Sequence, residues 1–464
     1  MSTPTQLGHV LFRILLYRND AAEILLETTS EGFRLPVLCV PAHRREAEEI
    51  TGAIRTSWNL ETYGLFRLPA AVSAHPFVHD YVVESCQADT DGPLGMEWLS
   101  MGSLSVEAFQ TRSDFAAIQN SLLILDQYRG NELPGPFGKP GWLRTLTDWV
   151  DRQASAAGLH LTGAVRQLNA SPTFSLIRFA TDGPALWFKA VGEPNVHEHR
   201  VTIKLAAAFP KFLPDILASR PEWNAWLSVE SKGSPLGECS SETAWAGVAE
   251  TLALLQISSF GRRFELIEAG CRDLRPCMLL DLADPFFDSM TQLMKRQTKI
   301  SPATLSRCEL LALGREITSA LGELEDAGIP NTLGHLDLNP GNILVSPTRC
   351  VFLDWQAAYI GPPFPSFQYL LEHWHRFRGE DSRHEESLVR SYLKHWVRFA
   401  STSQIASLCR IAPLLAAFMY ALSIPHSINP ENINQQTAGY LRSLSRRMMR
   451  EVRALGERKA LCIT

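Results

Sequence analysis

The sequence lacks the features of exported and membrane-spanning chains. No basic segment followed by an apolar run opens it, and its most apolar stretch, residues 413–424, is too short to cross a bilayer. Its nine cysteines are scattered and include no Cys-x-x-Cys pair, which disfavours a disulfide framework. Lys and Arg total 44 against 49 Asp and Glu, so there is no basic excess for nucleic acid or anionic membranes. We expect a cytoplasmic protein that binds neither.

What the sequence does contain is enough apolar residues for a large core, 45% of 464 residues, and its length suggests two or three domains. Short β-rich runs surround a helical pattern at 44–58, which predicts a small α/β domain over residues 1–130. Closely spaced Pro and Gly make 131–141 a linker and domain boundary. An amphipathic helix over 142–157 then packs on the next domain as a brace.

The richest chemical pattern lies in residues 335–355. Asp337, Asn342 and Asp354 occur on two short apolar segments that a turn at 346–349 can fold into a hairpin. Phosphoryl transfer requires a carboxylate that accepts the proton of the acceptor hydroxyl, and oxygen ligands that hold Mg²⁺ against the phosphates. These residue types therefore predict a magnesium-dependent phosphoryl-transfer site.

His335, Asp337, Asn342 and the pair Asp354-Trp355 resemble the pattern of the aminoglycoside phosphotransferase and choline kinase family, a branch of the protein-kinase-like fold. The resemblance implies that Asp337 is the catalytic base, that Asn342 and Asp354 bind Mg²⁺, and that ATP is the donor. His335 is expected to fix the loop by hydrogen bonds rather than to transfer the proton.

The resemblance also implies a bilobal α+β fold. The kinase-like phosphotransferase domain would span residues 142–464, with a β-rich N-lobe over about 160–232 and a helical C-lobe over about 233–464. Leu336 stands where protein kinases carry Arg, which favours a small-molecule hydroxyl as acceptor over a protein.

Within the expected N-lobe, Lys189 lies in an apolar strand, where a lysine needs an anionic partner. By the resemblance, Lys189 and Glu198 form the ion pair that positions the nucleotide, while the alternative is an edge-strand lysine with an exposed tip. The phosphate-covering turn at 169–173 has no Gly, so Ser171 and backbone N–H groups would serve there. Glu230 ends the last strand before an adenine-binding hinge and is counted among the nucleotide-binding candidates.

The helix near residues 45–58 resembles the acidic helix of Nudix hydrolases. Ile50 and Val37 stand where that motif has glutamates, so a solvated helix face is the better interpretation of these acids. We expect residues 1–130 to have at most a Nudix-like fold that lacks the hydrolase site. Formation of a homodimer through these residues is left open.

Three functions follow, of which a small-molecule kinase is favoured. The others are a nucleotide-binding pseudokinase that acts as a sensor, and diphosphate hydrolysis by residues 1–130. His373 and His375 are expected to be surface histidines rather than a metal pair. The acceptor is left open between an acidic and an aromatic pocket, whose floor would come from Trp355, Tyr359, Phe367, Tyr369, Glu372 and Trp374.

Overall fold

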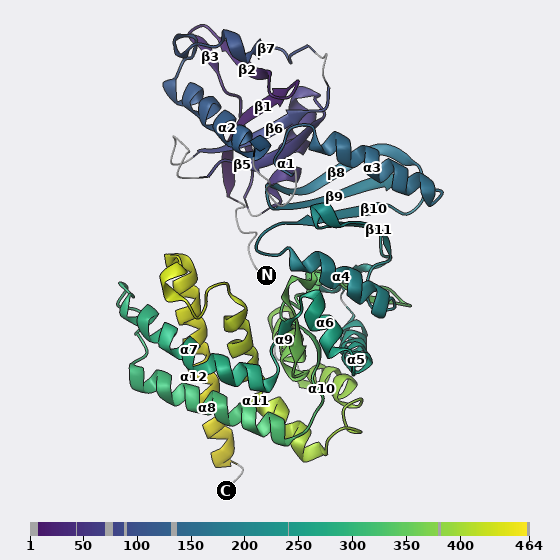
Figure 1. The fold of residues 1–464 in the computed structure, drawn as a ribbon, viewed down its shortest axis with the longest axis vertical. Helices are drawn as coiled ribbons and strands as arrows, with labels where there is room; N and C mark the ends of the chain where they lie inside the picture. Colours follow the sequence, from purple (N-terminus) through teal and green to yellow (C-terminus); the bar gives the residue numbers. More distant parts are fainter. Residues whose placement is uncertain are drawn as a thin grey trace. The chain divides into compact units, whose positions relative to one another are not determined.

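The computed structural model describes residues 8–42, 44–69, 78–87, 91–130, 137–239, 241–378 and 382–461. The chain divides into two compact units, one of residues 1–199 and 215–230, the other of residues 200–214 and 231–464 (Figure 1). The first unit thus combines the predicted N-terminal domain with the predicted N-lobe. Residues 131–136 of the predicted linker, and Cys462, lie outside the described residues.

The N-terminal part of the first unit is a seven-stranded mixed sheet. Its path is β3-β2-β1-β6-β5, with β4 beside β1 and β7 beside β2, and only β1 and β6 are parallel. The strands are β1 (His9–Arg18), β2 (Glu23–Thr29), β3 (Gly32–Arg34), β4 (Val37–Pro41), β5 (Thr62–Arg67), β6 (Val78–Ser85) and β7 (Met96–Ser100).

A helix packs on each side of this sheet. On one side, α1 (Glu46–Trp58) buries Ile50 and Ile54 in a cluster with Phe12 of β1. On the other, α2 (Arg112–Gly130) buries Leu125 in a cluster with Leu15. Because side chains alternate along a strand, β1 supplies both clusters. The small α/β domain expected over residues 1–130 has this layered form.

The N-lobe part is a five-stranded antiparallel sheet in the order β11-β12-β10-β9-β8. Its strands are β8 (Leu161–Ser171), β9 (Phe174–Thr181), β10 (Leu186–Val191), β11 (Ile216–Arg220) and β12 (Ala225–Val229). This agrees with the β-rich N-lobe expected over about 160–232, with Lys189 on β10 and Glu230 directly after β12, whereas β11, with no fully buried residue, was not expected.

Helix α3 (Trp142–Ala156) joins the two sheets of the first unit. Trp142 and Trp149 lie 6.4 and 6.2 Å, centroid to centroid, from the ring of Phe188 on β10. The same buried cluster includes Leu15 of the N-terminal sheet, so the two sheets share one hydrophobic core. The predicted brace helix therefore packs between the N-terminal sheet and the N-lobe.

The second unit is mostly helical. Its helices are the C-terminal part of α4 (His197–Ala208), α5 (Glu242–Ser258), α6 (Arg263–Ala269), α7 (Pro276–Lys295), α8 (Arg307–Asp326), α9 (Phe364–Arg378), α10 (Ser382–Leu393), α11 (Thr402–Ser423) and α12 (Gln435–Leu461). Together with the sheet-rich first unit, this confirms the α+β class with a helical C-terminal region.

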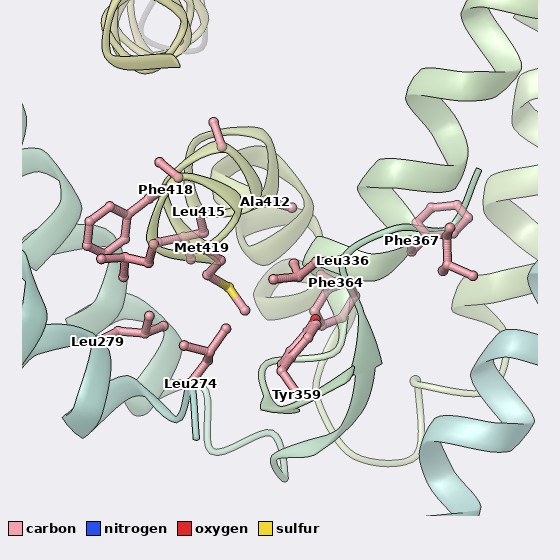
Figure 2. Close-up of a cluster of buried hydrophobic side chains, with 14 of the residues drawn as sticks. Leu274, Leu279, Leu336, Tyr359, Phe364, Phe367, Ala412, Leu415, Phe418 and Met419 are labelled. Carbon is pink, nitrogen blue, oxygen red and sulfur yellow. The ribbon is translucent and has the colours of Figure 1, made fainter. Parts of the chain in front are cut away.

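Helix α11 supplies much of the core of the second unit. Figure 2 shows its side chains, among them Leu415, Phe418 and Met419, in a buried cluster that also contains Leu274 and Leu279. By length and composition α11 could cross a membrane, with a mean hydropathy of 1.8, but 67% of its most apolar window is buried in the protein. The apolar stretch 413–424, expected to be too short to cross a bilayer, thus belongs to a longer helix that lies in the core of this unit.

Two small sheets lie among these helices and carry the predicted motif. One contains β13 (Ser234–Pro235), β16 (Ile343–Val345) and β17 (Cys350–Phe352), and the other contains β14 (Arg272–Asp273), β15 (Thr332–His335) and β18 (Ala358–Gly361). β16 and β17 form an antiparallel hairpin with Ile343 opposite Phe352. The turn of this hairpin is closed by Ser346 N–H, which donates to Arg349 O at 2.9 Å, so the expected hairpin is present.

Candidate active site

His335, at the end of β15, connects the two segments of the motif. Its Nδ1 accepts a hydrogen bond from Asp337 N–H at 3.0 Å, and its Nε2 lies 3.0 Å from the carbonyl oxygen of Leu353. Because Nδ1 accepts, the ring proton is on Nε2 and is donated to Leu353. A neutral His335 therefore ties the Asp337 loop to the residue before Asp354.

Asp337 lies at the centre of a short network of amides. Its carboxylate accepts hydrogen bonds from Nδ2 of Asn339 at 3.2 Å and from Nδ2 of Asn342 at 3.3 Å. Asn342 Nδ2 also donates to the backbone oxygen of Asp337 at 3.1 Å. The structure thus places two of the predicted site residues, Asp337 and Asn342, in direct contact.

Asn339 was missed by the sequence reasoning. Its Oδ1 accepts a hydrogen bond from Gly341 N–H at 2.9 Å and begins the single 3-10 turn η5 (Pro340–Asn342), while its Nδ2 holds Asp337. Asn followed by Pro-Gly is a turn-initiating pattern, because the side chain of Asn can accept a hydrogen bond from the backbone two residues ahead. That pattern was available in the sequence and could have identified Asn339 as a positioning residue.

The hairpin sets the relation between Asn342 and Asp354. Ile343 and Phe352 are the last paired residues of the hairpin. One residue further, Leu353 N–H donates to Asn342 O at 2.8 Å. Asp354 is the next residue after Leu353. Asp354 has φ 63° and ψ 63°, the left-handed region that few non-glycine residues adopt. Residues held in such conformations concentrate at functional sites.

The donor set of Asn342 and Asp354 fits Mg²⁺ by its chemistry. The Asn342 amide nitrogen faces Asp337, which leaves the amide oxygen as the ligand atom, and Asp354 adds a carboxylate. Mg²⁺ commonly takes one or two protein oxygens and completes its shell with water and phosphate. Within the described ranges, no group of three or more His, Cys, Asp or Glu side chains is placed to hold a metal. These residues therefore suit a cation that is also bound by phosphate oxygens, rather than a cation bound by protein ligands alone.

The predicted pair of Lys189 and Glu198 is present in the first unit. Lys189 Nζ, on β10, lies 2.6 Å from Glu198 Oε1 in the first turn of α4, and the two side chains are 15% and 2% exposed. The ammonium also lies 5.7 Å from the ring centroid of Phe174 and 5.6 Å from that of Trp226. Lys189 is therefore not an edge-strand lysine with an exposed tip.

The side chains of the other two nucleotide-binding candidates, Ser171 and Glu230, form hydrogen bonds within the N-lobe sheet. Ser171 Oγ accepts from Thr173 N–H and donates to Phe174 O, each at 3.3 Å, within the β8–β9 turn. The Glu230 carboxylate binds Arg178 at 2.6 and 3.0 Å and Trp187 Nε1 at 3.1 Å. The hydrogen bonds from Arg178 are the main reason that the pKa of Glu230 is lowered.

The expected acceptor floor is largely wrong. Tyr359 and Trp374 are fully buried, Trp355 donates to Phe352 O, and Phe367 stacks on Tyr392 with ring centroids 4.0 Å apart. These four side chains are core: Phe367 and Trp374 lie on the buried face of α9, Tyr359 lies on β18, and Trp355 lies in the 3-10 turn that precedes β18.

The remaining candidates, Tyr369 and Glu372, are half-buried. Both contact residues that were not among the predicted site residues. The rings of Tyr369 and Tyr420 are 5.5 Å apart, and Tyr440 packs edge-on to Tyr420. Glu372 forms an ion pair with Arg447. Burial and the neighbouring Tyr440 raise the pKa of Tyr420, and the negative charge of Asp337 adds a smaller effect in the same direction.

The two histidines of α9, both expected at the surface, differ in their surroundings. His375 Nε2 lies 3.1 Å from Glu385 on α10, and both side chains are more than one-third exposed. His373 is half-buried, and desolvation lowers its pKa.

The acidic helix α1 has its glutamates paired with arginines. Glu46 binds Arg67 at 3.0 Å, and Glu48 binds Arg166 of β8. Glu49 lies 3.3 Å from Arg44. These carboxylates are thus engaged by cationic side chains, in keeping with the interpretation of this helix as a face without the hydrolase ligands.

A glycine before the motif is required by close packing. A Cβ on Gly334 of β15 would lie 2.0 Å from Cζ of the Tyr359 ring. Because Tyr359 is fully buried, Gly334→Ala should lower the free energy of unfolding by about 3 kcal/mol, measured by urea denaturation. Gly247→Ala is the control, because Gly247 is an exposed position of α5 with open space around it, and should raise stability by about 1 kcal/mol. Equal stability of the Gly334→Ala variant and the wild type would contradict the packing.

Several solved structures are similar to this chain. A macrolide 2′-phosphotransferase from Brachybacterium faecium is 19% identical, with a TM-score of 0.41 over 62% of this chain and 99% of that one. A choline kinase from Streptococcus pneumoniae is 17% identical, with a TM-score of 0.42 over 68% and 99%. A choline kinase from Cryptosporidium parvum is 11% identical, with a TM-score of 0.46 over 68% and 97%.

Comparison of the sequence with protein families is more specific. No curated protein matches the chain significantly. Residues 241–400 match the model of the phosphotransferase enzyme family, and this segment includes His335, Asp337, Asn342 and Asp354. On this match, the predicted family resemblance and the predicted type of enzyme, a small-molecule phosphotransferase, are confirmed for this chain.

Proposed function

We propose that this protein transfers the γ-phosphate of ATP to a hydroxyl group of a small molecule in a Mg²⁺-dependent reaction. The observation that carries the proposal is the arrangement of Asp337, Asn342 and Asp354 around the β16–β17 hairpin. The Asp337 carboxylate is held by the amides of Asn339 and Asn342. Asn342 and Asp354 supply oxygen atoms from the two sides of the hairpin. A carboxylate and oxygen ligands are the groups that phosphoryl transfer needs.

In this proposal each residue has a separate role. The Asp337 carboxylate accepts the proton of the acceptor hydroxyl, while Asn339 and His335 hold it in place. Mg²⁺ held by Asn342 and Asp354 would neutralise charge on the β- and γ-phosphates. Lys189, fixed by Glu198, orients the α- and β-phosphates. Ser171 and Glu230 shape the turn and the strand end of the nucleotide-binding sheet rather than bind the nucleotide with their side chains.

Aromatic residues of α9, α11 and α12 bear on the class of acceptor. Tyr369, Tyr420 and Tyr440 offer aromatic faces, and the one carboxylate of the predicted floor, Glu372, is engaged by Arg447. Aromatic faces bind organic cations through the ring quadrupole. We therefore favour an amino alcohol or a comparable cationic alcohol over a polycationic antibiotic as the acceptor.

Label transfer tests the proposed function. Purified protein with γ-labelled ATP and Mg²⁺ should label at least one member of a panel that contains choline, ethanolamine, a macrolide, an aminoglycoside and other hydroxylated metabolites. Chelation of Mg²⁺ by EDTA should abolish the transfer, and restored Mg²⁺ should recover it. Nucleotide binding without transfer to any acceptor would instead favour the pseudokinase.

The compartment is proposed together with the activity. ATP is abundant in the cytoplasm, and none of the eight cysteines among the described residues is in a disulfide, which fits a reducing compartment. We therefore place the protein in the cytoplasm.

A further inference from the structure

A cleft of about 350 Å³ lies in the first unit at the N-terminal end of α1. Arg44, the N-cap residue Arg45 and Ala47 line it at the start of the helix, and Asn169 and Ala170 line it from the end of β8. The N-cap residue, Arg45, makes no side-chain capping hydrogen bond. The first N–H groups of this 13-residue helix are therefore open to an anion, which the helix dipole also favours.

Tyr81 of β6 gives a second and independent sign of a ligand. It lines the same cleft although its side chain is only 1% exposed. Its hydroxyl has no hydrogen-bond partner among the residues that the structure describes. This oxygen is not among the fully buried polar atoms that lack a partner, so it is open to the cleft that the side chain lines. Burial raises the pKa of Tyr81, so the hydroxyl stays protonated and can donate.

The charges around the cleft favour an anion over a cation. Glu46 also lines it, but its carboxylate binds Arg67 at 3.0 Å, and the other two acids of the first turn are paired with Arg44 and Arg166. Arg45 has no ion-pair partner in the described part of the chain. After these pairs are formed, the charge that remains at the helix end is positive.

We propose that this cleft binds a soluble phosphate monoester. The phosphate lies at the N-terminus of α1, where backbone N–H groups, the Arg45 guanidinium and the Tyr81 hydroxyl donate to its oxygens. A cleft of about 350 Å³ is at the lower end of the range for small-molecule sites, so it holds the phosphate with a short organic group.

The position of the cleft connects it to the N-lobe sheet. Arg166 of β8 is paired with Glu48 of α1, and Gln167 exchanges hydrogen bonds of 2.8 and 2.9 Å with the backbone of Gly64. The same strand continues to Asn169 and Ala170, which line the cleft. A ligand at α1 therefore contacts the end of β8, which leads into β9, and its binding can be measured separately from phosphoryl transfer.

Binding can be measured without nucleotide or acceptor. The full-length protein is titrated calorimetrically with glycerol 3-phosphate and, in a second arm, with inorganic phosphate, at constant ionic strength. Tyr81→Phe removes only the hydroxyl and should weaken glycerol 3-phosphate binding about tenfold. Arg45→Gln should weaken it by a similar factor. Tighter binding of the ester than of inorganic phosphate is expected, because the cleft has room for the organic group.

Two control variants test whether the loss of affinity is specific to residues of the cleft. Arg34→Gln removes another exposed arginine of the N-terminal sheet, one paired with Glu27, and should leave the affinity unchanged. Lys189→Met should also leave it unchanged, which separates the cleft from the proposed nucleotide site. Affinity that is the same in wild type, Tyr81→Phe and Arg45→Gln, or that is lost with Lys189→Met instead, would overturn the proposal. Neither of these two outcomes would count against the proposed phosphoryl transfer, which is tested separately.

Discussion

Replacing Asp337 by Asn is expected to lower turnover by about 10² to 10⁴ while leaving nucleotide affinity nearly intact. The amide keeps the size of the carboxylate and one oxygen that can accept from Asn339 or Asn342, so the loop should hold its conformation. What it loses is the basicity that would take the proton from the acceptor hydroxyl. Turnover is measured by label transfer, and affinity by nucleotide titration.

Asp288→Asn is a suitable control for this substitution. Asp288 is an exposed residue of α7, so the same loss of one negative charge there should leave turnover unchanged. Unchanged turnover in the Asp337→Asn protein would refute the role of Asp337 as base. A loss of nucleotide affinity equal to the loss of turnover would show that the residue serves binding rather than proton transfer.

The second large effect is expected at the pair of Lys189 and Glu198. Lys189→Met leaves the Glu198 carboxylate, 2% exposed, without this ammonium, and should lower the free energy of unfolding by about 3 kcal/mol. It also removes the cation proposed for the phosphates, so kcat/KM for ATP should fall about 100-fold. Urea denaturation and steady-state kinetics with varied ATP measure the two effects.

A double variant separates stability from function. Lys189→Met combined with Glu198→Gln removes both charges and should recover much of the stability but none of the kcat/KM. Lys204→Met is the matched control, because Lys204 on α4 forms a pair with Glu265 in which both side chains are about one-third or more exposed. Such surface pairs contribute well under 1 kcal/mol. Recovery of activity in the double variant would contradict the nucleotide-positioning role.

Local patterns accounted for much of this molecule. The apolar run around Lys189 predicted β10, and the turn-forming residues around Pro347 predicted the β16–β17 hairpin. The family resemblance implied that His335 fixes the loop by hydrogen bonds, and its ring bonds to Asp337 N–H and to Leu353 O. These features depend on residues that are close in the chain, where the period of side chains and the geometry of a turn are decisive.

Contacts between distant residues could not be predicted in the same way. The sequence showed Arg13, Asp80 and Asp114 as ordinary charges, yet the structure buries them together, with Arg13 Nε 2.6 Å from Asp80 and Nη1 2.8 Å from Asp114. Aromatic residues of α9 were expected at the acceptor floor, but which face of a helix turns inward depends on the helices that pack against it. Tyr420, on α11, was therefore missed.

By itself, the sequence determined the kind of chemistry, through the residue types and spacing of the motif, and the class of secondary structure, through local periodicity. Only the tertiary structure decided which side chains meet: that Asn339 holds Asp337, that Glu230 is engaged by Arg178, and that the N-terminal sheet shares a core with the N-lobe. The physical reason is that burial and pairing arise from the packing of elements far apart in the chain, which local pattern does not encode.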